Sequence, residues 1–129
     1  MRFCLTIAYD GTNYAGWQVQ PGHTTVQEVI ELAIEAMAGV RVKLHGSGRT
    51  DRGVHARGQV AHFVLDTRMT VRSILFALNA RLPQDIRITS VKKVGDNFHA
   101  RRTAHSKEYR YCIFNGKILT KEFFIKELG

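Results

Sequence analysis

Cysteine and proline occur only twice each in this sequence, and long apolar runs are missing. Cys4 and Cys112 stand far apart, so they form neither a disulfide framework nor a CxxC pair. No apolar run approaches the roughly 20 residues that span a bilayer. Residues 1–9 are too short and too strand-like for a signal peptide. We therefore expect a protein of the reducing cytoplasm, without a membrane segment.

Metal-binding spacings are missing as well. The sequence contains no HxH or HExxH pattern, and no cysteine accompanies its central histidines. We therefore expect no metal site. The histidines concerned are His45, His55, His62, His99 and His105.

Acidic residues are in the minority: 11 Asp and Glu stand against 19 Lys and Arg, which gives a net charge of +8. The surplus is concentrated in residues 41–62, with a net charge of +4, and in residues 99–110, with +3. Charge clustered in this way favours a polyanionic partner such as nucleic acid. The alternative is a solvated basic face that has no partner.

The remaining composition is typical of one folded domain, with 44% hydrophobic residues in 129. Hydrophobic spacing, turn residues and the capping pattern of Thr25 and Glu28 predict its elements. These are strands at 3–9, 40–44, 59–65, 86–94 and 108–114, with helices at 25–38 and between Thr70 and Pro83.

This order predicts an α+β fold of the ferredoxin-like, RNA-recognition-like type: a split βαβ unit whose antiparallel sheet carries two helices on one face. Tyr14 and Trp17 are open to two interpretations, as core residues or as RNA contacts.

The predicted loop at 46–58 is the most unusual stretch. It places Arg49, Asp51, Arg52, His55 and Arg57 between four glycines. Asp51 is the only carboxylate for many residues on either side, and the surrounding cations keep it ionised. An ionised carboxylate can act as a nucleophile or a general base. The alternative is a surface turn with an Arg–Asp salt bridge.

The segment GRTDRGVHARGQV at 48–60 resembles the signature of the tRNA pseudouridine synthase A family. Further segments resemble that family too, over residues 1–116. They are YDGT at 9–12, GWQ at 16–18, TVQE at 25–28, FHAR at 98–101 and KEYRY at 107–111.

The resemblance implies a fold like half of a pseudouridine synthase. It also implies an enzyme that isomerises uridine to pseudouridine in the anticodon stem-loop of tRNA, without metal or organic cofactor. Asp51 matches the essential aspartate, which attacks the sugar or deprotonates it. Arg49 matches an arginine that replaces the flipped base, and Tyr109 matches a tyrosine that stacks on the uracil.

The same resemblance implies a homodimer whose partner is tRNA, and the two basic segments contain the side chains that we expect to bind it. The predicted RNA-binding residues are Arg52, His55, Arg57, Arg101, Arg102, Lys107 and Arg110.

Two features depart from the family. Its members are about twice as long, with a second half that completes the cleft, whereas this chain ends at Gly129. We therefore expect an N-terminal catalytic-aspartate domain at 1–116 and an atypical tail at 117–129. The sequence leaves two interpretations open: a truncated or N-terminal portion of the isomerase, or a catalytically silent RNA-binding domain of the same fold.

Overall fold

The computed structural model describes residues 1–48 and 52–95. The strand predicted at 108–114 therefore lies outside the described residues. The elements within these ranges are β1 (Arg2–Tyr9), the 3-10 turn η1 (Gly11–Asn13), α1 (Val26–Ala38), β2 (His45–Gly46), β3 (Ala56–Val64), α2 (Val71–Arg81) and β4 (Ile86–Val94).

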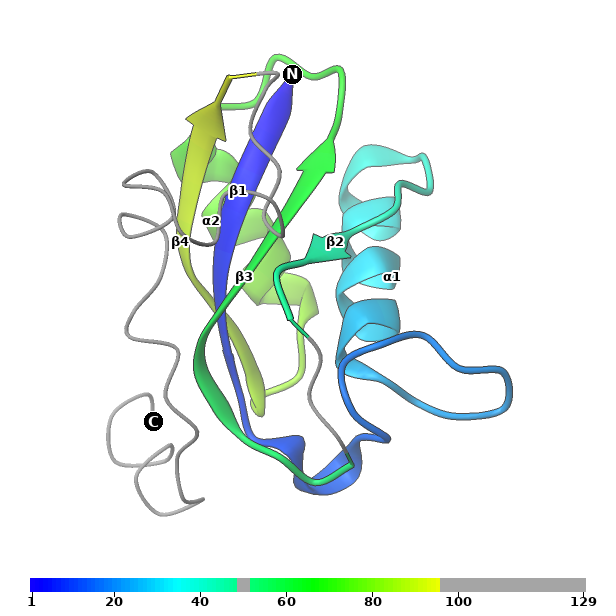
Figure 1. The fold of residues 1–129 in the computed structure, drawn as a ribbon. Coiled ribbons are helices and arrows are strands. Elements are labelled where there is room, and N and C mark those ends of the chain that lie inside the picture. The colour runs from blue at the N-terminus through cyan, green and yellow to red at the C-terminus, as the bar shows by residue number, and fades with distance from the viewer. Residues whose placement is uncertain (49–51, 96–129) are drawn as a thin grey trace.

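The four strands form one antiparallel sheet in the order β2-β3-β1-β4. Both helices pack on the same face of this sheet (Figure 1). This arrangement confirms the predicted α+β, ferredoxin-like fold. Neither helix in the described part of the chain is long and apolar enough to cross a membrane.

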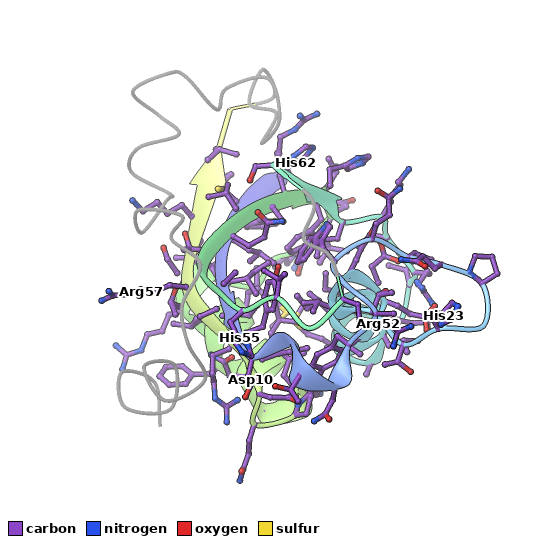
Figure 2. All side chains as sticks on the ribbon, turned by 60° about the horizontal axis from the view of Figure 1, so that its bottom comes forward. Asp10, His23, Arg52, His55, Arg57 and His62 are labelled. Carbon is purple, nitrogen blue, oxygen red and sulfur yellow. The ribbon has the colours of Figure 1, made fainter. Side chains whose placement is uncertain are left out.

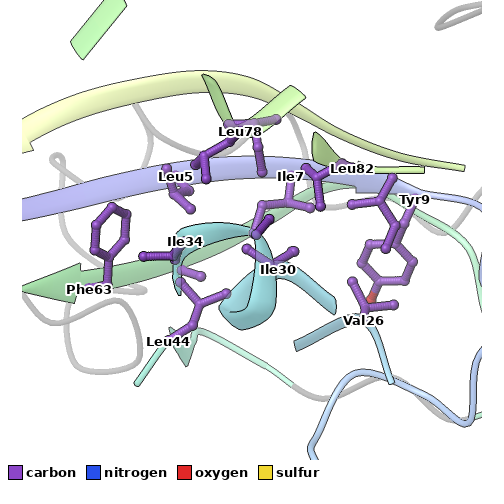
Figure 3. Packing of buried hydrophobic residues seen from close by; sticks show 14 of the residues in the cluster. Leu5, Ile7, Tyr9, Val26, Ile30, Ile34, Leu44, Phe63, Leu78 and Leu82 are labelled. Atoms are coloured by element: carbon purple, nitrogen blue, oxygen red, sulfur yellow. The ribbon is translucent and has the colours of Figure 1, made fainter. Parts of the chain in front are cut away.

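The core lies between the sheet and the helices. Alternate residues of β1 point toward the helices, and Leu5, Ile7 and Tyr9 are fully buried there (Figure 3). Ile30 of α1 and Leu78 of α2 meet them from the helix side (Figure 3). Each such side chain contributes about 1.5–3 kcal/mol when removed from water, so the core fixes both helices on the sheet.

Both helices begin directly after the capping residues that the sequence predicts, Thr25 and Thr70. The Thr25 hydroxyl accepts a hydrogen bond from the backbone N–H of Glu28, and the Thr70 hydroxyl accepts one from that of Ser73. Gly39 follows the last residue of α1 in the left-handed conformation.

The strand predicted at 40–44 is wrong, because only His45 and Gly46 pair with β3. The backbone of Leu44 is bound by side chains of α1 instead. Its N–H donates to the Glu31 carboxylate at 2.9 Å, and its carbonyl accepts from the Gln27 amide at 2.9 Å. The Leu44 side chain is fully buried, which explains the apolar pattern without a strand.

The predicted loop at 46–58 is also too long. β3 begins at Ala56 rather than at Gln59, because Tyr9 at the end of β1 pairs with Ala56 after a shift in register. The loop between β2 and β3 is therefore shorter than the glycine content predicts.

Tyr14 and Trp17 are core residues, 5% and 3% exposed. The Trp17 indole stacks on the Tyr9 ring, with 6.2 Å between ring centroids. It also fills the space beside Gly46, where a Cβ atom would lie 2.4 Å from the indole nitrogen. Of the two interpretations from sequence, core packing is therefore confirmed.

Candidate functional site

The loop from β2 to β3 starts from a firm attachment to β3. The Ser47 N–H donates to the Val60 carbonyl at 2.8 Å, and the Ser47 hydroxyl donates to the Gln59 side-chain carbonyl at 3.0 Å. The Gln59 amide nitrogen in turn donates to the Gly48 carbonyl at 2.6 Å. A single buried glutamine thus holds the first two residues of the loop.

The end of the loop is attached to the segment that follows β1. The Gly53 N–H donates to the Tyr14 carbonyl at 3.3 Å. The Val54 carbonyl lies so close to Gly11 that a Cβ atom there would sit 1.9 Å from the oxygen. Only glycine fits at position 11, because any side chain would push the loop away.

A half-buried histidine and a buried aspartate complete this second attachment. His55 Nδ1 lies 3.0 Å from Asp10 Oδ1 and 2.9 Å from the Gly11 nitrogen. Figure 2 shows the two side chains together at the end of the sheet where β1 ends and β3 begins. Their side chains are only 16% and 8% exposed, so this contact is largely shielded from water.

Asp85, just before β4, braces the same end of the sheet. Its carbonyl accepts from the Asp10 N–H at 2.9 Å, and its carboxylate accepts from the Tyr14 hydroxyl. Burial, together with the hydrogen bond to Asp85, raises the pKa of Tyr14 well above its ordinary value. The tyrosine therefore stays neutral and serves as a donor.

The sheet face opposite the helices carries basic groups. The strand register aligns His45, His62, Cys4 and Lys92 in one row across all four strands. The His45 and His62 rings stack with 4.8 Å between centroids. In the described part of the chain, no three His, Cys, Asp or Glu side chains are arranged to hold a metal ion.

The charge of His45 is set by its surroundings on that face. Burial lowers the pKa of His45, and the nearby positive charges of Lys43 and Arg2 lower it further. Glu31 acts in the opposite direction but is the smallest of these influences. The lowered pKa favours a neutral imidazole at neutral pH.

The described RNA-binding candidates do not form one cluster. Arg52 is exposed, with its guanidinium 3.5 Å from the His23 ring, whereas Arg57 points to the other side of the molecule (Figure 2). The side chain of His55 is directed inward to Asp10. The remaining predicted site residues lie outside the described residues: Arg49, Asp51, Arg101, Arg102, Lys107, Tyr109 and Arg110.

Sequence reasoning assigned no role to three residues that shape this site: Asp10, Gly11 and Gln59. All three lie within quoted motifs, YDGT and GRTDRGVHARGQV. The motifs mark these residues as candidates for a role in the site. The sequence does not show that Asp10 contacts His55, because the two residues are 45 positions apart.

Comparison with known proteins shows the family of the chain. The family model described as tRNA pseudouridine synthase matches residues 5–101. The chain therefore belongs to the tRNA pseudouridine synthase family.

Its relatives include proteins named tRNA pseudouridine synthase A. The protein from Citrifermentans bemidjiense is 54% identical over 84% of this chain and 44% of its own length. The one from Caldicellulosiruptor saccharolyticus is 52% identical over 88% and 46%. "tRNA pseudouridine synthase A 1" from Desulfotalea psychrophila is 48% identical over 92% and 47%. The chain thus spans about half the length of the curated relatives it matches.

Proposed function

We propose that this chain takes part in isomerising uridine to pseudouridine in the anticodon stem-loop of tRNA, with Asp51 as the essential carboxylate. The observation that carries the proposal is the attachment of the loop at both ends. Gly48 is held by Gln59, and Gly53 is held by Tyr14, so only four residues, 49–52, separate the two attachments. A catalytic group needs this kind of fixed support.

The reaction exchanges one bond to the sugar for another. The bond from C1′ to N1 of uracil breaks, the ring turns, and a bond from C1′ to C5 forms. C5 then loses its proton, and N1 gains one. In the proposal Asp51 begins the exchange, either by attacking the sugar or by removing a proton from it.

Two further residues have proposed substrate contacts. The target base must leave its stack before its reacting atoms can be reached. Arg49 would occupy the space of the flipped base, and Tyr109 would stack on the uracil. The proposal requires neither a metal nor an organic cofactor.

The proposal assigns residues 1–116 to the catalytic-aspartate domain and 117–129 to an atypical tail. It places the protein in the cytoplasm as a homodimer, with tRNA as its partner. The basic residues proposed to bind RNA are Arg52, His55, Arg57, Arg101, Arg102, Lys107 and Arg110. The positive charges of the arginines and of Lys107 suit phosphate contacts, which position an RNA without reading its sequence.

The test is release of tritium from tRNA that carries C5-tritiated uridine. Asp51→Asn keeps the size of the side chain but removes its charge. In any form of the protein that is active on tRNA, we expect this substitution to abolish tritium release. The affinity for tRNA should stay within about twofold of the wild-type value. Turnover near the wild-type rate would remove Asp51 from the mechanism.

The second candidate, a catalytically silent RNA-binding domain, is favoured by the coverage of only about half of each relative. The same assay separates the two candidates. Tight tRNA binding without tritium release, from this chain and from a chain extended by the second half of a relative, would support the silent domain.

A further inference from the structure

We propose that Asp10 and His55 are positioning residues that hold the end of the Asp51 loop in place for the reaction. This inference rests on the function proposed above. Neither residue is assigned to touch the reacting atoms in this role. They act through the backbone between His55 and Asp51, which is only four positions long.

Asp10 supplies a rigid base for this contact. Its Oδ1 atom accepts hydrogen bonds from the Thr12 N–H at 3.0 Å and from the Thr12 hydroxyl at 2.6 Å. Its own N–H donates to the Asp85 carbonyl, and its backbone follows the last residue of the central strand β1. These contacts fix the Asp10 carboxylate relative to the sheet, and none of them involves His55.

His55 connects this base to the loop through one atom. Its Nδ1 atom lies between the Gly11 N–H, at 2.9 Å, and Asp10 Oδ1, at 3.0 Å. Without a proton, Nδ1 accepts from the Gly11 N–H; with a proton, it donates to the Asp10 carboxylate. Either hydrogen bond joins the His55 ring to residues 10 and 11, which follow β1.

The backbone contacts on either side make the attachment specific. The Val54 carbonyl touches Gly11, and the Gly53 N–H reaches the Tyr14 carbonyl. Residues 53–55 are thus held by residues 10–14 over three successive positions. Loss of the His55 contact would free the loop at the point where it enters β3, and a displacement of about 1 Å costs on the order of 100-fold in rate.

This role differs measurably from the direct RNA contact proposed for His55. A side chain that only binds RNA would lower tRNA affinity when removed and leave kcat at saturating tRNA unchanged. A positioning residue would lower kcat and leave affinity unchanged. A purely structural residue would lower the melting temperature without a selective effect on kcat.

The first experiment needs no turnover. Amide hydrogen exchange, followed by mass spectrometry, is measured on the intact chain for peptides that cover residues 47–58. In His55→Ala we expect exchange at 53–56 to accelerate at least tenfold. His55→Asn, whose amide can meet the Gly11 N–H and Asp10, should restore it to within about threefold. His23→Ala, which removes an exposed ring next to Arg52, is the control and should match wild type.

A double substitution tests the pairing. If Asp10 and His55 act as a unit, Asp10→Ala combined with His55→Ala exchanges no faster than the more affected single variant. Wild-type exchange at 53–56 in His55→Ala would overturn the proposal. So would additive effects of the two substitutions.

Kinetics then provide the second readout. In a form of the protein that releases tritium, His55→Ala should lower kcat at least tenfold and change the Kd for tRNA by less than threefold, with recovery in His55→Asn. A raised Kd with unchanged kcat would overturn the positioning role in favour of RNA contact. If the proposed function is wrong, the wild-type protein releases no tritium. In that case the hydrogen-exchange experiment alone decides whether Asp10 and His55 hold the loop.

Discussion

Single residues at the end of the sheet determine how closely two chain segments approach. Gly11 admits the Val54 carbonyl, and Gly46 admits the Trp17 indole. In each case a Cβ atom would lie closer than 3 Å to its neighbour, so even alanine would force one segment outward. Tight contacts of this kind hold the loop without contributing an ionisable group.

His45 gives stability a dependence on pH. Because its pKa is lowered in the folded chain, the unfolded chain binds a proton more readily. Protonation of His45 therefore favours the unfolded chain; this cost to folding is absent well above the unfolded pKa of about 6.5 and grows as the pH falls below it. We expect the free energy of unfolding, measured with urea, to decrease between pH 7.5 and pH 5.5.

His45→Gln should make this decrease smaller, and His23→Gln, at an exposed position, should leave it unchanged. If the free energy of unfolding decreased equally with falling pH in wild type and in His45→Gln, the prediction would be contradicted.

At the scale of elements, α1 shapes the chain that leads into β2. The Glu31 carboxylate accepts from the Leu44 N–H, the Gln27 amide and the Arg41 guanidinium. The first two bonds are buried, whereas Arg41 is 43% exposed. The buried bonds therefore matter more than the ion pair.

Removing each partner tests this difference. Glu31→Ala should lower the free energy of unfolding by about 2–3 kcal/mol, because it leaves the buried Leu44 N–H without its acceptor. Arg41→Ala should cost less than about 1 kcal/mol, because Arg41 is 43% exposed and the buried hydrogen bonds of Glu31 remain. Urea unfolding of both variants provides the measurement, and equal losses would show that the ion pair carries the stability.

These contacts also explain what could be predicted from sequence. Caps and apolar spacing are local signals, and they located α1, α2 and the long strands. The alternation of Val40, Val42 and Leu44 resembles a strand, but its backbone partners are side chains on a helix. Likewise, the motif marks the loop residues, whereas the Asp10–His55 contact depends on a fold that brings distant segments together.

At the scale of the whole molecule, acidic residues are absent from the described strands of the sheet. The six acidic residues in the described ranges lie on α1 or in connecting segments and include none of the four strands' residues. The row of His45, His62, Cys4 and Lys92 on the opposite sheet face therefore has no acidic neighbour on its own strands. The charged residues within the four strands are all basic, so a polyanion approaching the sheet would meet positive potential. They are Arg2, Arg57, Arg87, Lys92 and Lys93.

Binding of tRNA should therefore depend strongly on salt. If the basic residues contact phosphates, the logarithm of the association constant falls with the logarithm of salt concentration by roughly 0.7–0.9 per phosphate. Arg101→Ala and Arg102→Ala should each make this slope shallower in filter-binding titrations. The control is Arg81→Ala, at the end of α2, where the guanidinium donates to the Ala77 carbonyl. Affinity that stays constant over a severalfold rise in salt would refute the electrostatic proposal.

The coverage of about half of each relative also predicts reduced activity. We expect the 129-residue chain on its own to release tritium orders of magnitude more slowly than a full-length relative, because it spans only about half of such a relative. We also expect light scattering to give a dimeric or larger mass. Full activity, or a monomeric mass across a wide concentration range, would count against these expectations.

The packing of Trp17 has a practical consequence. It is the only tryptophan in the chain, and its indole is buried between Tyr9 and Gly46, beside the residue at which the loop starts. Intrinsic fluorescence excited at the indole band therefore reports on this one corner of the protein. A red shift of its emission would signal that β2 has separated from the segment that contains Trp17, and it would do so without any attached dye.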